Sequence, residues 1–126
     1  MLTFRQSTGE LDLNGKVFAA HSGRGEGLNN PAMENVEKVG PIPKGWYSLG
    51  SWLDGRAYSA ADARLGPFVS RLTPDPGNEM YGRSGFFIHG GDGSNPPTDS
   101  EGCIVTFRSA RQAIASAGET RLQVIP

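Results

Sequence analysis

Glycine and proline divide this chain into short pieces. Eighteen glycines and nine prolines are spread over 126 residues, and the glycine share is about twice the ordinary one. Because proline cannot continue a helix and glycine favours turns, long regular elements are excluded from most of the chain. Aromatic and β-branched residues recur between the turns, so we expect a folded domain of many short strands rather than disorder.

Alternating apolar and polar residues predict where these strands lie. Residues 2–6, 10–13 and 16–21 read as an antiparallel meander, in which Asn14-Gly15 is a hairpin signal because both residues tolerate a positive φ. Residues 22–45 are too polar and too rich in breakers for a regular element and predict a long surface loop. The later strands are expected at 46–53, 66–72, 85–90, 103–107 and 120–125.

One segment has the pattern of a helix, residues 109–118. Ser109 is its expected N-cap, Gln112 stands at the capping-box position, and Gly118 is the expected terminator. Strands nevertheless dominate. We therefore expect a single domain over 1–126, mainly β, built as an antiparallel β-sandwich or a partly open barrel with one short helix near the C-terminus.

Charge and hydropathy exclude several classes of partner. The formal net charge is −1 and the basic residues are scattered, whereas binding to nucleic acid needs a concentrated positive field. No run of about 18 apolar residues predicts a membrane span, and the N-terminus has no signal-peptide pattern. The sequence predicts a monomer that binds no nucleic acid and is made in the cytoplasm without a Sec signal.

The chain uses cysteine once, at Cys103, shortly after a polar loop that begins with His89. A single cysteine forms no internal disulfide, so it is a buried apolar residue, a metal ligand or a nucleophile. A histidine within hydrogen-bond reach would activate the thiol, and a small polar setting favours the nucleophile. Gly102 would let a substrate approach the backbone, and the amides of Gly102 and Cys103 are candidate oxyanion donors.

A zinc site made of His21, His89 and Cys103 is an alternative. The sequence offers no close ligand pair such as CxxC or HExxH, so we expect neither a metal nor another cofactor.

The segment that holds His89 and Cys103, together with two earlier stretches of the chain, resembles a known enzyme family. Residues 88–105, IHGGDGSNPPTDSEGCIV, resemble the signature of YkuD-type L,D-transpeptidases, in which His-Gly precedes a Ser/Thr-His-Gly-Cys block. The chain as a whole is similar to the shorter Tlde1-type L,D-transpeptidase effectors, through SGRGEGLNNP at 22–31 and GPIPKGWYSLG at 40–50. Glu101 replaces the second histidine of the signature, and the spacing from His89 to Ser100 is short. Both departures fit the effector group.

The resemblance implies an enzyme that acts on bacterial peptidoglycan. Cys103 would attack the meso-diaminopimelate carbonyl of a tetrapeptide stem and release D-alanine, His89 would be the base, and the Gly90 carbonyl would orient the imidazole. The acceptor would be water, a D-amino acid or a second stem. Without a Sec signal, such an enzyme would be a type VI secretion effector that acts in the periplasm of a target bacterium, with a cognate immunity protein in the producer.

Four side chains are weaker candidates for substrate contact: Ser100, Glu101, Asp92 and Arg108. A serine in a tight loop usually caps a turn, and an arginine near a helix start is often solvated. Other functions remain open. A papain-like amidase or endopeptidase is one, although its cysteine usually precedes its histidine; a catalytically inactive module that binds cell wall or an immunity protein is another.

Overall fold

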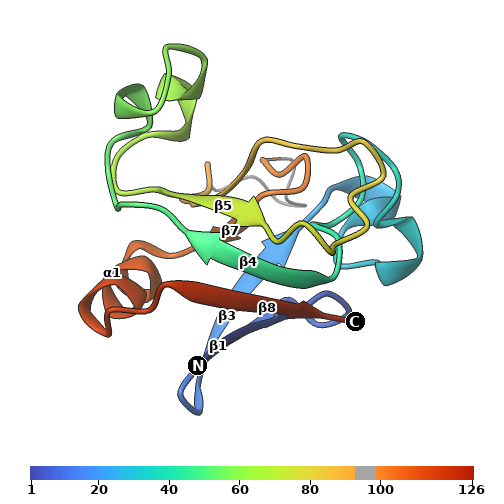
Figure 1. Ribbon diagram of the computed structural model, residues 1–126, viewed down its shortest axis with the longest axis horizontal. Coiled ribbons are helices and arrows are strands. Elements are labelled where there is room, and N and C mark those ends of the chain that lie inside the picture. Colours follow the sequence, from blue (N-terminus) through green and yellow to red (C-terminus); the bar gives the residue numbers. More distant parts are fainter. Residues whose placement is uncertain (93–98) are drawn as a thin grey trace.

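Eight strands of the described chain close into a barrel in the order β1-β2-β3-β7-β6-β5-β4-β8 (Figure 1). The computed structural model describes residues 1–92 and 99–126. Part of the loop predicted between His89 and Cys103, residues 93–98, therefore lies outside the described residues. The strands are β1 Leu2–Arg5, β2 Glu10–Leu13, β3 Lys16–Ser22, β4 Gly45–Leu49, β5 Ser70–Pro74, β6 Phe86–His89, β7 Ile104–Thr106 and β8 Arg121–Ile125.

Most neighbouring strands are antiparallel, and two pairs are parallel: β1 with β8, and β6 with β7. The first three strands form the predicted meander, with Asn14 at φ 52° and Gly15 at φ 94° in the turn between β2 and β3. The mainly β fold is confirmed. The barrel is closed rather than partly open, because β8 pairs with β4 on one edge and with β1 on the other.

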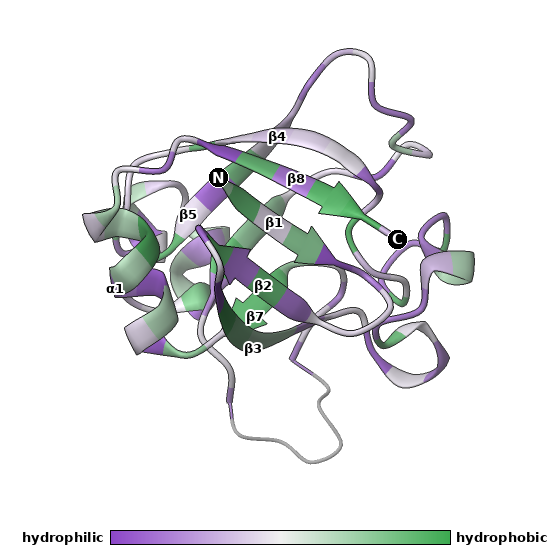
Figure 2. Ribbon diagram, turned by 90° about the horizontal axis from the view of Figure 1, so that it is seen from below, coloured by the Kyte–Doolittle hydropathy of each residue, from purple (hydrophilic) through white to green (hydrophobic). Residues whose placement is uncertain are grey.

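The barrel interior holds the main core. Hydrophobic and hydrophilic residues alternate along β2 and β8 (Figure 2), and in both strands every second residue is buried. The members of this core with the lowest exposure include Leu2, Phe4, Leu11, Tyr47, Ile88, Ile104, Ile114 and Leu122. A smaller cluster of Leu65, Val69 and Phe87 lies outside it, with Cys103 packed against it.

The segment between β4 and β5 projects from the barrel (Figure 1). The strand predicted at 46–53 ends earlier, at Leu49, and the strand predicted at 66–72 begins later, at Ser70. Beyond these ends, the two segments are joined by a single isolated bridge between Leu53 and Val69. Two 3-10 helices occupy the intervening residues, η3 Gly55–Ala57 and η4 Ala61–Leu65.

The long loop of residues 22–45 is not wholly a surface loop. It contains two short 3-10 helices, η1 Gly25–Gly27 and η2 Pro31–Met33, and its first and last residues belong to β3 and β4. Ile42 is fully buried in the core, and the Glu34 side chain is nearly so. The polar sequence concealed this, because Glu34 is buried with hydrogen-bond partners drawn from distant segments.

Helix α1, Arg108–Ser116, starts one residue before the predicted position. Phe107, in an extended conformation, is the N-cap, and no side chain caps the helix. The predictions that Ser109 is the N-cap and that Gln112 completes a capping box are therefore wrong. The physical reason is that burial sets the start: the Arg111 amide donates to the Phe107 carbonyl, and Ala110, Arg111 and Ile114 face inward. Gly118, at φ +70°, follows the helix end as predicted.

No helix in residues 1–92 or 99–126 is long and apolar enough to cross a membrane.

Candidate active site

The parallel pairing of β6 with β7 brings His89 and Cys103 to the same face of the sheet. Ile88 pairs with Ile104 and His89 with Val105, so Cys103 stands beside Phe87 at the start of β7. Ile88 and Ile104 point into the barrel core. Because side chains alternate along a strand, Phe87, His89 and Cys103 share the outer face.

Both side chains line one cleft of about 390 Å³, which we call the cysteine cleft. It lies between the turn before β6, helix η4 and the long loop. Its other lining residues include Arg64, Arg83, Gly85, Glu101 and Asp99.

His89 ends β6 with a fixed ring orientation. The side chain is buried, and its Nδ1 lies 2.8 Å from the carbonyl oxygen of Gly90. A carbonyl oxygen only accepts, so Nδ1 carries a proton and Nε2 of the neutral ring is left with its lone pair. Burial lowers the pKa of His89, although the Gly90 carbonyl and the carboxylate of Asp99 act in the opposite direction. The ring is therefore neutral near pH 7 and able to accept a proton.

The thiol of Cys103 is held in its protonated form. It donates to the Gly85 carbonyl oxygen, with 3.7 Å between the heavy atoms. Burial raises the pKa of the thiol to about 11, whereas the Phe87 amide and the Arg64 charge lower it. With this raised pKa, the free protein holds a thiol rather than a thiolate near neutral pH. A nucleophile of this kind has to lose its proton during the attack itself.

Ser100 has a different place from the expected substrate contact. Its side chain is fully buried, and its hydroxyl donates to the Cys103 carbonyl at 2.6 Å. The Ser100 hydroxyl oxygen also accepts hydrogen bonds from the backbone amides of Gly102, at 3.2 Å, and Gly23, at 3.0 Å. Ser100 therefore shapes the loop that carries the cysteine, as a turn-capping serine does.

The Gly102 amide points at that hydroxyl rather than into the cleft. The expected contribution of Gly102 to an oxyanion hole is therefore corrected. The amide that the structure places beside the sulfur is that of Phe87.

Arg83 is a residue that sequence reasoning missed. Its buried guanidinium donates to four carbonyl oxygens: those of Glu34, Pro41, Gly40 and Glu101. It thereby fastens the segment from Asp99 to Cys103, which we call the cysteine loop, to the long loop of residues 22–45. No signal in the sequence distinguished it, because an arginine in a turn-rich segment is ordinarily solvated.

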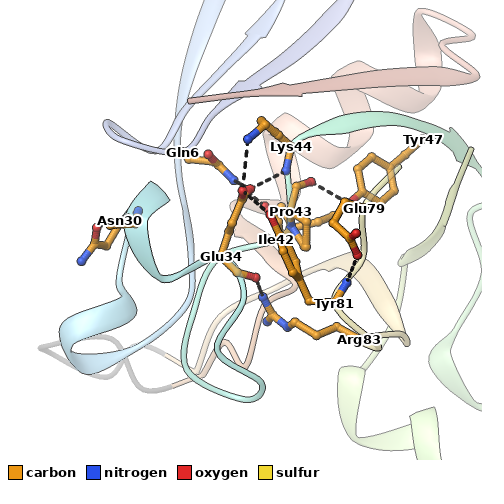
Figure 3. A network of polar contacts seen from close by, with 11 residues as sticks. Gln6, Asn30, Glu34, Ile42, Pro43, Lys44, Tyr47, Glu79, Tyr81 and Arg83 are labelled. Atoms are coloured by element: carbon orange, nitrogen blue, oxygen red, sulfur yellow. Dashed lines mark hydrogen bonds and ion pairs between the residues drawn. The ribbon is translucent and has the colours of Figure 1, made fainter. Parts of the chain in front are cut away.

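The long loop is itself fixed through Glu34 (Figure 3). The Glu34 carboxylate accepts from the Gln6 side chain at 3.0 Å, the Lys44 amide at 2.9 Å and the Tyr81 hydroxyl at 3.2 Å. Burial on its own would raise the pKa of Glu34, but the hydrogen bonds from Lys44 and Gln6 outweigh it and lower the pKa. A chain of contacts thus runs from the barrel through Glu34 and Arg83 to the cysteine loop.

Asp99 is the second residue that was missed. Its Oδ1 lies 2.6 Å from Nε2 of His21, and its Oδ2 accepts from the Asp92 amide at 2.9 Å. His21 is thereby paired with Asp99. No group of three metal-binding side chains occurs in the part of the chain that the structure describes.

The remaining candidates are divided between clefts. Glu101 lines the cysteine cleft and is exposed. Asp92 lines an adjoining cleft that also reaches His89. Arg108 lies elsewhere: its guanidinium stacks on the Phe68 ring at 5.7 Å and lines a third cleft beside His21.

The fold and the cleft define a β-barrel domain with a cysteine and a neutral histidine that line one cleft on its outer face. The family model of the Tlde1 domain matches residues 16–126, and the chain belongs to this family.

Solved structures show the same fold. This chain is similar to the crystal structure of Mycobacterium tuberculosis L,D-transpeptidase 1, with a TM-score of 0.56 and 17% sequence identity. The match covers 100% of this chain and 61% of the transpeptidase chain. It is also similar to the structure of LD transpeptidase LdtMt1 in complex with imipenem, with a TM-score of 0.54 and 17% sequence identity. That match covers 98% of this chain and 57% of the LdtMt1 chain. The chain thus spans less than two thirds of either structure, and its fold is L,D-transpeptidase-like. No curated protein matches it in sequence.

Proposed function

We propose that the domain is a cysteine acyltransferase that acts on the meso-diaminopimelate tetrapeptide stems of peptidoglycan. The observation that carries the proposal is the placement of Cys103 and a neutral His89 in one cleft on one face of the barrel. Membership of the Tlde1 family and the likeness in fold to L,D-transpeptidases support it. This is the function that we expected from the sequence resemblance.

The groups in the cleft suit a concerted first step. Cys103 Sγ forms a bond to the meso-diaminopimelate carbonyl carbon while its proton passes to Nε2 of His89. The tetrahedral intermediate then collapses, the bond to the D-alanine nitrogen breaks, and His89 returns the proton to that nitrogen. The products are a thioester on Cys103 and free D-alanine. A raised thiol pKa fits this order, because the proton moves only when a carbonyl is present.

The thioester can pass to water, to a free D-amino acid or to the amine of a second stem. These outcomes are carboxypeptidase activity, exchange and transpeptidation. In each, the acceptor gives a proton to His89 and the thiol recovers one when the thioester breaks. We propose the same cleft for all three.

The biological setting is part of the proposal. An enzyme of the Tlde1 family that attacks stem peptides would be an antibacterial effector delivered by a type VI secretion system into the periplasm of a target cell. Its producer would then hold a cognate immunity protein.

A catalytically inactive binding module is the second candidate. The observation in its favour is the Cys103 thiol, whose pKa burial raises to about 11, as in an inert core cysteine. The intermediate exposure of Cys103 and the presence of the His89 imidazole in the same cleft favour the enzyme.

Mass spectrometry of purified disaccharide-tetrapeptides tests the choice. The protein should remove D-alanine, or exchange it when another D-amino acid is added, and leave the glycan intact. Cys103→Ala should do neither. Cleaved glycan, or equal activity of the Cys103→Ala protein, would reject the proposal.

A further inference from the structure

A second cleft, of about 440 Å³, adjoins the cysteine cleft and shares His89 with it. We call it the arginine cleft. Arg64 and Leu65 of η4 form one wall, Gly90 and Gly91 after β6 form another, and Arg111 of α1 contributes the third. The mechanism above makes no use of these two arginines.

Arg111 is a buried cation. The residue is 6% exposed, and its Nη1 donates to the carbonyl oxygens of Pro67 at 3.0 Å and Phe68 at 2.8 Å. Its Nε is buried without a partner, and within residues 1–92 and 99–126 no carboxylate pairs with the guanidinium. Burying a charge without a counterion is costly, so such a group calls for an anion.

Gly90 brings this guanidinium next to the catalytic histidine. A Cβ at Gly90 would lie 2.7 Å from Nη2 of Arg111, so the guanidinium approaches the Gly90 backbone closely where no side chain intervenes. The Gly90 carbonyl also orients His89. Both arginine charges act on this imidazole, because Arg64 and Arg111 contribute to lowering its pKa.

Arg64 stands where the two clefts meet. It is exposed, lines both clefts, and meets no carboxylate in the described part of the chain. Asp92 and Asp99 also line the arginine cleft, but both oxygens of Asp99 are engaged, by His21 and by the Asp92 amide. Asp92 stands exposed at the rim. Among the described residues, neither of the two arginines in these walls forms an ion pair with a carboxylate.

We propose that the arginine cleft binds the α-carboxylate of the C-terminal residue of the stem peptide, through Arg64 and Arg111. The inference rests on the proposed function. The leaving nitrogen has to meet Nε2 of His89, and the α-carboxylate is one carbon atom away from that nitrogen. The arginine cleft reaches the same imidazole as the cysteine cleft, and it has the two arginines that can receive this carboxylate. Arginine suits the site, since its planar fork matches a carboxylate. A stem that ends in a free carboxylate is then preferred over one that is amidated or extended.

Binding to the Cys103→Ala protein tests the subsite without turnover. Two probes are used in calorimetric titration: a disaccharide-tetrapeptide that ends in D-alanine, and the same compound that ends in D-alaninamide. The acid should bind about tenfold tighter, as one charge-assisted hydrogen-bond pair allows. Adding Arg64→Gln should remove most of this preference. Adding Arg56→Gln should keep it, because Arg56 is an exposed arginine on η3 that pairs with Asp54 and lines neither cleft.

Equal affinity for the acid and the amide, a preference that survives Arg64→Gln, or binding of neither probe would overturn the subsite. Turnover by the unaltered protein separates this from the proposed function. A chain that processes the acid and the amide equally well retains the proposed function and loses the subsite. A chain that processes neither loses the proposed function.

Discussion

The guanidinium of Arg83 donates a hydrogen bond to the carbonyl oxygen of Glu101 at 3.1 Å, two residues before Cys103. The same Nη2 donates to Gly40, and Nη1 donates to the long loop. The position of the cysteine therefore depends on a side chain whose hydrogen bonds go to backbone carbonyls of two loops.

Arg83→Gln tests this dependence. The shorter, neutral amide cannot reach four carbonyls, and buried carbonyls left without donors cost free energy, so we expect a loss of about 2–4 kcal/mol in the free energy of unfolding. Urea denaturation measures it. Activity at a temperature where the variant is folded should fall as well. Arg56→Gln, on the surface, should change stability by less than about 0.5 kcal/mol. An Arg83→Gln protein of unchanged stability and activity would contradict the assigned role.

Gly102→Ala should damage the same loop by another route. Gly102 has φ +135°, and a Cβ there would lie 2.5 Å from Nη2 of Arg83 and 2.8 Å from the Phe86 ring. We expect a cost of about 1–3 kcal/mol for the strained backbone alone, together with a loss of activity. Thermal denaturation and muropeptide turnover measure the two effects. Gly77→Ala is the matched control, since a Cβ at Gly77 meets nothing within 4 Å; a similar loss in both variants would show that the cause is general.

The reactivity of Cys103 should rise at unusually high pH. Burial raises the pKa of this thiol to about 11, so the thiolate is scarce at pH 8 and becomes abundant only above pH 10. The rate of alkylation by iodoacetamide can be followed by mass spectrometry between pH 7 and 11. Its midpoint should lie above the pKa of free cysteine, which is about 8.5. A midpoint below 8 would contradict the burial argument.

The stability of the fold should respond with a matching sign. Because the folded pKa is raised, the folded state holds the thiol proton more tightly than the unfolded state does. This contribution is complete below the ordinary cysteine pKa and is lost as the pH rises towards 11. Cys103→Ala should remove that part of the alkaline decline in urea denaturation. An unchanged alkaline decline would place its cause in other groups.

Cys103→Ala, His89→Ala and the double variant should be equally inactive on muropeptides, because a nucleophile and its base act as a unit. The two single variants should differ in their free energy of unfolding. Removing the Cys103 sulfur should cost about 1 kcal/mol. His89 is 5% exposed, and its loss also leaves the Gly90 carbonyl without its ring donor, so His89→Ala should cost more. A folded Cys103→Ala protein that still releases D-alanine would move the nucleophile elsewhere.

Local residue patterns were sufficient for most of the strands, the turn at Asn14-Gly15 and the helix terminator Gly118, because each depends on neighbours along the chain. The choice of Cys103 and His89 as candidates also came from the sequence, through their residue types and the small polar loop. The helix start was predicted wrongly, because Ser109 is a good capping residue in isolation, whereas burial of Arg111 and Ile114 decides where α1 begins.

Residue order and composition by themselves thus determined a β domain with a short helix and one thiol near a histidine. Only the tertiary structure decided the rest: the closure of the barrel through β1 and β8, the protonated state of Cys103, and the inward turn of Ser100 and the Gly102 amide. It also decided that Arg83 holds the cysteine loop and that Arg64, not Arg108, lies beside His89. The physical reason is that burial and hydrogen-bond partners come from segments 80 or more positions apart, such as Ser22 with Gly102 and β1 with β8, and no local pattern records them.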